Sequence, residues 1–451
     1  MKKSFQLNLI AISIATLLLS GCNDTEGSVG ELSEIIDEDD GHEHETVELE
    51  GRLAVLSADS DQAVLFGLTD GELLDTFSLT YDSNTLTASA DYRYAVIASR
   101  ANNYIGFIDS GIYQEDHGDH LHPYEQAPVM LDFTLNGNSP THIVKHDGNM
   151  IVFNDGNADA GISASVQVLT DSDISSESTE IPQLDYTINM HGVAKIQGEY
   201  LLSTVRRDEA ETTSAGTLPD QVGIFHLHDG EYEQEGVLEE NCPDLHGAAQ
   251  NHEYVAFGCT DGVLIAHPHD DEYHAEKIAN IDEVGDARIG SLYGHEESDS
   301  MIGIASGMLF AINPGVASME KLEWQVADGV AAVSYGFSHE AEYFLVLDNA
   351  GFLNILSAHD HDGEAHWELE TSIDISEEDV STMPEGLSFS MTAAQNGDYV
   401  FVADPIAKHI LQIDLETKEI IGDIETSFTP KSLIWLGLAE EGHDDDEEHA
   451  H

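Results

Sequence analysis

A repeated unit of short strands is the feature that most constrains the fold of this chain. In each unit a short first strand, a polar turn, a strongly apolar strand and a second turn lead into a strand that ends in Asp or His. Units of about 40 to 55 residues with three or four strands are typical of the blades of a β-propeller. The repeat therefore predicts an all-β fold of that class. First strands are expected to begin near Leu86, Thr141, His191, His246, Ile289, Ala331, Leu387 and Ser432.

The eighth unit is incomplete, because 432–437 supplies only one strand. The strands expected between Arg52 and Leu79 complete that blade, so that N- and C-terminal strands together close the ring. We therefore expect eight blades. Seven blades are the alternative, because no regular repeat word such as Trp-Asp marks each unit.

The first 22 residues predict a secretion signal. Lys2 and Lys3 precede an apolar stretch, 7–19, that is too short for a transmembrane helix. The tetrapeptide Leu-Ser-Gly-Cys that ends at Cys22 matches a bacterial lipobox. We therefore expect a periplasmic protein that is lipid-anchored at Cys22 to a bacterial envelope membrane. Ordinary cleavage near Gly21 is the alternative.

Acidic, histidine-containing segments flank the expected propeller. Residues 23–50 contain twelve Asp or Glu and no Lys or Arg, and 438–451 are similarly acidic. Such segments cannot bury a core, so we expect both to be disordered. The propeller is expected to occupy 51–437.

The charge of the chain excludes several classes of partner. It carries 87 Asp and Glu against 15 Lys and Arg, a formal net charge of −72, together with 24 His. A nucleic-acid binder needs a cationic surface, and so does a protein attracted to anionic lipid. Contact with a membrane is therefore expected only through the lipid anchor. Imidazole beside carboxylate favours a borderline divalent metal such as zinc.

Two further cysteines, Cys242 and Cys259, predict one disulfide between neighbouring strands. They flank 16 residues of a chain that we expect to be exported, where oxidation is the default. A thiolate metal site is the alternative.

Histidines at equivalent places in three consecutive units predict a metal site. Each opens an expected innermost strand, and innermost strands line the channel of a propeller. We expect these imidazoles at one side of the channel mouth, with the preceding histidine-rich loop, 115–122, folded over it. Three or four of the six would form a tetrahedral zinc site, whereas a core histidine bonded to backbone is the alternative for each. The candidate ligands are His142, His191 and His246, with His117, His120 and His122 from the loop.

Other histidines are weaker candidates. His42 and His44 alternate in the N-terminal segment and are possible auxiliary ligands. Further histidines at 226–228, 267–274 and 359–361 are expected in solvated outer turns, with weak adventitious metal binding as the alternative.

Several stretches resemble the periplasmic zinc metallochaperones of the AztD type. They are 115–120, 139–148, 191–194, 242–249 and 255–264, and the paired-cysteine segment is the most distinctive. The resemblance implies a β-propeller that carries zinc to the solute-binding protein of a zinc ABC transporter. It also implies a high-affinity zinc site near the six candidate histidines, and an N-terminus whose His42 and His44 assist loading or handover.

Catalytic motifs are not found in the chain. It has no Gly-rich phosphate loop, no His-Glu-x-x-His and no Gly-x-Ser-x-Gly. We therefore expect a monomeric zinc-binding metallochaperone of the cell envelope and not an enzyme. A periplasmic zinc buffer and a metal-dependent propeller hydrolase or lactonase are the alternatives.

Overall fold

The computed structural model describes residues 50–82, 84–116, 121–207, 218–269, 272–324, 329–361 and 364–440. The predicted signal with Cys22, the segment with His42 and His44, and the C-terminal segment lie outside these residues, as do His117 and His120. In the described part of the chain, no helix is long and apolar enough to span a membrane.

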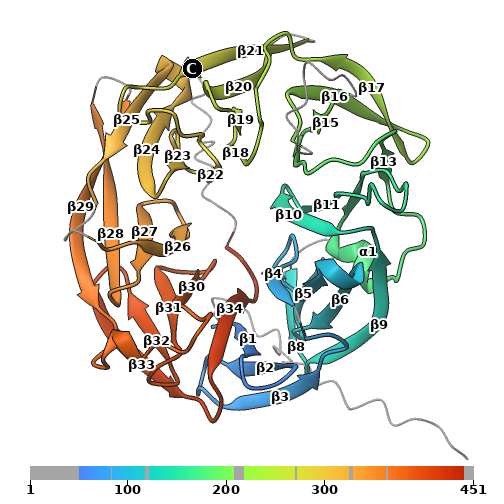
Figure 1. Ribbon diagram of the computed structural model, residues 1–451. Helices are drawn as coiled ribbons and strands as arrows, with labels where there is room; N and C mark the ends of the chain where they lie inside the picture. Colours follow the sequence, from blue (N-terminus) through green and yellow to red (C-terminus); the bar gives the residue numbers. More distant parts are fainter. Residues whose placement is uncertain are drawn as a thin grey trace, which may run out of the picture. The chain divides into compact units, whose positions relative to one another are not determined.

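The described chain forms eight four-stranded antiparallel blades of a β-propeller (Figure 1). The outermost strands of the second and third blades are joined by one parallel residue pair, Gln183 with Glu231, so that these two blades form a single eight-stranded sheet. We number the blades in chain order of their innermost strands. Blade 1 contains β4 (Thr85–Ala88), β5 (Tyr94–Ser99), β6 (Tyr104–Asp109) and β9 (Val129–Asn136), and blade 2 contains β10 (Pro140–His146), β11 (Asn149–Asn154), β12 (Ser165–Leu169) and β13 (Gln183–Asp185). Blade 3 contains β14 (Ala194–Gln197), β15 (Tyr200–Val205), β16 (Gln221–His228) and β17 (Glu231–Val237), and blade 4 contains β18 (Ala248–Gln250), β19 (Val255–Gly258), β20 (Gly262–His269) and β21 (Glu272–Ala279).

Blades 5 to 8 follow the same order from the inside outward. Blade 5 contains β22 (Ser291–Tyr293), β23 (Met301–Ala305), β24 (Met308–Asn313) and β25 (Ser318–Leu322), and blade 6 contains β26 (Ala332–Phe337), β27 (Tyr343–Asp348), β28 (Phe352–His361) and β29 (Glu364–Asp374). Blade 7 contains β30 (Ser390–Ala393), β31 (Tyr399–Asp404), β32 (His409–Asp414) and β33 (Glu419–Glu425), and blade 8 contains β34 (Pro430–Leu436), β1 (Arg52–Ser57), β2 (Gln62–Gly67) and β3 (Leu73–Ser78). Short additions are a hairpin of β7 (Ile112–Asp116) and β8 (Leu121–Glu125), the helix α1 (Asp171–Ser175), and the 3-10 turns η1 (Arg100–Asn102), η2 (Pro314–Val316) and η3 (Val380–Thr382).

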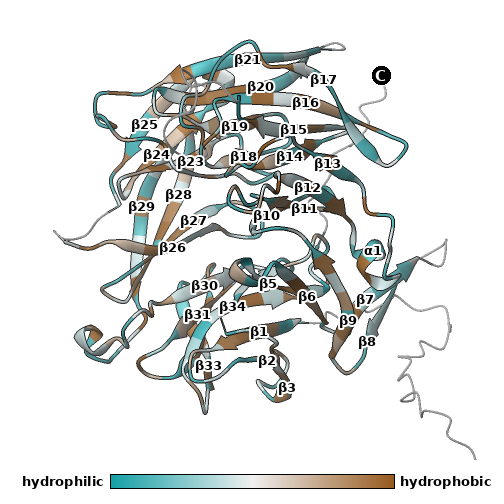
Figure 2. Ribbon diagram, turned by 45° about the vertical axis from the view of Figure 1, so that its right-hand side comes forward, coloured by the Kyte–Doolittle hydropathy of each residue, from teal (hydrophilic) through white to brown (hydrophobic). Residues whose placement is uncertain are grey.

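Burial on both faces explains why the middle strands are apolar runs. Every residue of β5 and β27 is buried, whereas most of the outer strand β3 is exposed. The cores lie between adjacent blades, so that Leu309 of blade 5 packs in one cluster with Phe344 and Trp367 of blade 6. Figure 2 shows this division, with apolar colour in β6 and β11 and hydrophilic colour in the outer strand β25.

The ring closes as the sequence predicts. The C-terminal strand β34 pairs with β1, with Leu53 opposite Trp435, and so becomes the innermost strand of blade 8. The prediction of eight blades is confirmed, and each observed first strand begins within a few residues of its expected start.

The predicted disulfide is present, but it does not join two neighbouring strands. Cys242 lies in the loop before β18, and Cys259 directly follows β19. Both cysteines are fully buried. The bond therefore ties a loop of blade 4 to the end of that blade's second strand.

Candidate metal centre

Three histidines from consecutive blades converge at one point. The Nε2 atom of His191 lies 3.4 Å from that of His142 and 3.1 Å from that of His246. Their ring centroids are 5.0 to 5.8 Å apart. The structure thus brings together the three channel-mouth residues that the sequence singles out.

The convergence follows from the blade architecture. His142 lies near the start of β10, and His191 and His246 precede β14 and β18. These three innermost strands contact one another in order, β10 with β14 and β14 with β18. Equivalent positions on adjacent blades therefore become neighbours at the end of the channel where the innermost strands begin.

Glycine follows two of these histidines for steric reasons. A Cβ atom on Gly192 would lie 2.5 Å from the Phe153 ring, so the backbone beside His191 packs closely against blade 2. Gly247 has a φ of +78°, which L side chains rarely adopt, and a Cβ there would approach the Gly290 carbonyl to 2.8 Å. Both positions favour glycine and hold the preceding imidazole in place.

The Nδ1 atoms of His191 and His246 each donate a hydrogen bond to an acceptor outside the cluster. His191 donates from Nδ1 to the Asp155 carboxylate at 3.0 Å, and His246 donates from Nδ1 to the Gly290 carbonyl at 2.6 Å. Because neither acceptor carries a proton, each Nδ1 must bear one, which leaves Nε2 as the ring's electron-pair donor. A carboxylate or carbonyl behind the ring is the arrangement that orients histidine ligands in metal sites.

Asp155 is itself held in position. This residue directly follows β11 next to the cluster, and its side chain is 8% exposed. Arg100, which follows β5, donates to the same carboxylate at 2.7 Å and to Thr141 at 2.9 Å. Burial raises the pKa of Asp155, but hydrogen bonds from His191 and Arg100 outweigh burial and place the pKa below its usual value. Asp155 therefore stays ionised behind His191.

Two of the three imidazoles, those of His142 and His246, have pKa values lowered toward the neutral form that binds metal. Burial is the largest cause that lowers the pKa of His142, to about 4, and the neighbouring His191 and His246 lower it further. Burial also lowers the pKa of His246, although its bond to Gly290 opposes this shift. Neutral rings are available as ligands without first losing a proton.

The donor set fits a tetrahedral cation. Zn–N bonds of 2.0 to 2.1 Å in a tetrahedron place neighbouring nitrogens about 3.3 Å apart, close to the 3.1 and 3.4 Å observed. Three nitrogens leave a fourth vertex for water or an incoming ligand. The His191 side chain is 25% exposed, so the cluster is within reach of solvent.

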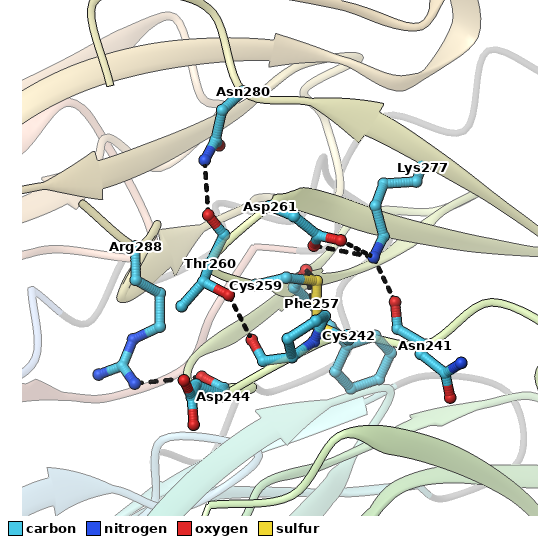
Figure 3. Close-up of a disulfide and its surroundings, with 11 residues drawn as sticks. Asn241, Cys242, Asp244, Phe257, Cys259, Thr260, Asp261, Lys277, Asn280 and Arg288 are labelled. Atoms are coloured by element: carbon cyan, nitrogen blue, oxygen red, sulfur yellow. Dashed lines mark hydrogen bonds and ion pairs between the residues drawn. A yellow bond between two sulfur atoms is a disulfide. The ribbon is translucent and has the colours of Figure 1, made fainter. Parts of the chain in front are cut away.

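His246 lies in the loop between β17 and β18, which also contains Cys242. Figure 3 shows the disulfide that fastens this loop to Cys259. The His246 amide donates to the Gly258 carbonyl at 3.0 Å, one residue before Cys259. Arg288 donates to the Asp244 carbonyl at 3.1 Å, and Thr260 donates through its amide to Pro243 at 3.0 Å. The loop is thus bonded on both sides of the disulfide, and this fixes where His246 stands.

The histidine-rich loop is placed differently from the expectation that it folds over this mouth. Its described part is the β7–β8 hairpin, which is inserted between β6 and β9. Because β5 ends beside the cluster at Arg100 and β6 runs antiparallel to it, β6 ends at the other end of the blade. His122 on β8 is not part of the cluster, and its ring centroid lies 6.2 Å from that of Tyr124.

The chain was compared with known proteins. No family model matches it. A curated protein, "Zinc chaperone AztD" of Citrobacter koseri, is 25% identical over 214 residues, which are 48% of this chain and 47% of that protein. The solved structure of apo AztD from Citrobacter koseri has a TM-score of 0.70 at 20% identity, over 86% of this chain and 98% of that one.

The chain resembles AztD in sequence and in fold. This confirms the resemblance that the sequence predicts. The matched stretch spans about half the length of the curated AztD, and at 20% identity the structural likeness shows the fold alone. Another structure, "Dihydro-heme d1 dehydrogenase NirN in complex with DHE", has a TM-score of 0.55 at 10% identity, over 86% of this chain and 75% of that one. One propeller fold therefore serves different chemistries, and function must be argued from the site.

The positions of Asp155, Arg100 and Gly290 around the histidine cluster were not predicted from the sequence. Asp155 directly follows Asn154 at the end of a strong apolar strand, where acids are common in this chain. Its partner His191 lies 36 residues away in the next blade. The place of Asp155 in the repeat could have predicted this contact, because a carboxylate just after the second strand of one blade lies near the start of the next blade.

Proposed function

We propose that this protein is a zinc carrier of the cell envelope, with His142, His191 and His246 as the ligands of the transported ion. One observation carries the proposal. Two imidazoles whose Nδ1 atoms both donate elsewhere direct their Nε2 atoms at each other across 3.1 Å. Two nitrogen lone pairs at this distance repel each other. A cation that binds between them accepts both lone pairs and removes this repulsion.

Transfer by ligand exchange suits this geometry. With three protein ligands, the fourth vertex of a tetrahedral ion is open to a donor from a recipient protein. An incoming imidazole can bind there before one of the three carrier histidines leaves. The recipient that we propose is the solute-binding protein of a zinc ABC transporter, in line with the chaperone that the chain resembles.

A carrier role fits the donor set better than hydrolysis does. The carboxylate nearest to the cluster, Asp155, already accepts bonds from His191 and Arg100. It holds a ligand in place and is not positioned as a general base for a metal-bound water.

The termini complete the proposal. A lipid on Cys22 would hold the protein at the envelope membrane, and the segment with His42 and His44 would assist loading or handover. We further propose His117, His120 and His122 as additional zinc ligands; of these, His122 lies on β8.

Zinc affinity of single-histidine variants tests the ligand set. Equilibrium dialysis against buffered Zn²⁺ should show a loss of at least about 100-fold for His142→Ala, His191→Ala and His246→Ala. His409→Ala is the matched control, because His409 lies on the outer part of blade 7, where it is hydrogen-bonded to Asp423. Wild-type affinity in all three variants would disprove the ligand set.

A transfer assay separates a carrier from a zinc buffer. Zinc-loaded protein is mixed with the apo solute-binding protein of a zinc transporter from the same organism. A carrier delivers zinc faster than a small chelator of equal affinity, whereas a buffer delivers it at the rate at which zinc dissociates.

A further inference from the structure

Three hairpins of the propeller share one six-residue pattern. It reads His-x-His-Asp-(Gly or Asp)-Glu, and each copy spans the turn between the third and fourth strands of a blade. The copies are His226-Leu227-His228-Asp229-Gly230-Glu231 in blade 3, His267-Pro268-His269-Asp270-Asp271-Glu272 in blade 4, and His359-Asp360-His361-Asp362-Gly363-Glu364 in blade 6.

The register of the strands is also the same in all three hairpins. In each, the second histidine is paired with the glutamate of the pattern, as in His228 opposite Glu231. The first histidine lies opposite another potential ligand, which is Glu233 in blade 3, His274 in blade 4 and His366 in blade 6. Residues two apart on a strand share a face, so the two histidines of the pattern project together in blade 3, and those of blade 4 do so as well.

The hairpin of blade 3 has the most complete geometry. Its turn residues Asp229 and Gly230 have φ values of +50° and +90°, as a tight two-residue hairpin turn requires. His226 Nδ1 lies 3.2 Å from His228 Nε2, and His228 Nε2 lies 3.6 Å from Glu235 Oε1. One ligand atom from each of these three residues lies within 4.8 Å of the others.

These separations are those of a metal site with nitrogen and oxygen ligands. The nitrogens are close to the roughly 3.3 Å edge of a tetrahedral zinc site. Glu199, from the turn between β14 and β15, lies 3.8 Å from His226 and adds negative charge. The side chains of His228 and Glu235 are each 47% exposed, so a cation can enter from solvent.

The hairpin of blade 4 repeats the pattern and adds a third histidine, although its ligand atoms are less closely grouped than those of blade 3. The ring centroid of His274 lies 5.0 Å from that of His269 and 6.0 Å from that of His267. His269 and His274 are exposed. In blade 6, His366 pairs with the exposed His359 and bonds to Glu320 of β25 at 2.7 Å.

We infer that the hairpin of blade 3 is a peripheral binding site for borderline divalent cations such as Zn²⁺, and that the hairpins of blades 4 and 6 share this role because they repeat its pattern and register. They are separate from the channel cluster. First and third strands of a blade run in the same direction, so a hairpin after the third strand lies at the opposite end from His142, His191 and His246. Each site is exposed and has few ligands, so it binds more weakly and exchanges faster than the channel cluster. The net charge of −72 concentrates cations around all three sites.

The repetition is the strongest argument for selection of this pattern. A single His-x-His in an acidic chain arises easily by chance. Three copies at one structural position, with the same partner glutamate in register, point to a shared requirement. Taken one hairpin at a time, these histidines are expected in solvated outer turns.

Zinc stoichiometry of the full-length protein tests the inference. A variant with six changes replaces both histidines of each pattern by Ala: His226→Ala, His228→Ala, His267→Ala, His269→Ala, His359→Ala and His361→Ala. Equilibrium dialysis should show that the weak class of sites loses about three equivalents of Zn²⁺ while tight binding is unchanged. The double change His226→Ala/His228→Ala alone should remove about one. A variant that carries His252→Ala and His409→Ala, two histidines outside the pattern, should retain all weak sites.

Each outcome decides the question. An unchanged weak class in the six-change variant would overturn the inference, because the ions would then be held only by the general acidic surface. Loss of the weak class in His142→Ala but not in the six-change variant would likewise overturn it. If hairpin-dependent binding persists while no tight site is found, the channel proposal fails and the hairpin sites stand. Unchanged circular dichroism and melting temperature show that the six-change variant is folded.

Discussion

The Nε2 atoms of His191 and His246 lie 3.1 Å apart although the Nδ1 atoms of both rings donate to other groups. The two facing nitrogens therefore both present lone pairs. Residues from two blades, brought together only by the ring, create an arrangement that a cation stabilises. This relationship is the basis of the predictions that follow.

Zinc should stabilise the folded protein. An ion that binds only the native state adds about 2.7 kcal/mol at a free concentration of 100 times its Kd. Thermal melting with and without Zn²⁺ should show a higher midpoint for the wild type. The gain should largely disappear in His246→Ala and persist in the control His409→Ala. An equal gain in both variants would place the stabilising ion elsewhere.

Asp155 should act through His191. Loss of such a partner behind a histidine ligand typically costs about 10- to 100-fold in metal affinity. We expect Asp155→Asn to lower zinc affinity within that range while one equivalent is still bound. Arg100→Gln should have a smaller effect, since Arg100 is 57% exposed and bonds to Asp155 and Thr141 but to none of the three histidines. Dialysis at matched free zinc measures both, and wild-type affinity in Asp155→Asn would argue against the positioning role.

The disulfide should contribute both to stability and to zinc binding. Closing a loop of this size restricts the unfolded chain and is worth about 3 kcal/mol. Cys242→Ser/Cys259→Ser should therefore unfold at lower urea concentration. Because Cys259 adjoins Gly258, whose carbonyl accepts from the His246 amide, zinc affinity should also fall. A variant that loses stability but binds zinc normally would show that the loop holds His246 without the bond.

Acid should destabilise the protein through His295. Burial is the largest cause that lowers the pKa of this histidine to about 4, and His339 adds to the shift. The unfolded chain, with a pKa near 6.5, binds a proton there between about pH 6.5 and 4 while the folded chain does not. The contribution is thus fully present above about pH 6.5 and is lost as pH falls toward 4. In urea titrations between pH 7 and 4.5, His295→Asn should show a shallower decline in stability than wild type. Parallel declines would contradict the assignment.

Much of the fold can be predicted from the sequence because blades are local. Each strand start, such as Thr85 or Pro140, follows from turn residues and apolar runs within some 50 residues of chain. The closure by β34 is predictable too, because the last unit lacks three strands that the first segment supplies.

The site is predictable only in part, for a physical reason. His142, His191 and His246 recur at one position of the repeat, and the ring turns this recurrence into proximity. The hydrogen bond between Asp155 and His191 depends instead on how blades 2 and 3 pack against each other, and this packing cannot be predicted from a local sequence pattern. The position of the β7–β8 hairpin depends on strand direction, and its described part lies away from the mouth that it was expected to cover.

Anomalous diffraction at the zinc edge tests the central claim most directly. Crystals of the zinc-loaded protein should show a peak about 2.0 to 2.1 Å from the Nε2 atoms of His142, His191 and His246. In crystals of His191→Ala grown in the same zinc concentration, that peak should vanish or weaken strongly. Bound zinc with no peak among these three histidines would contradict the account.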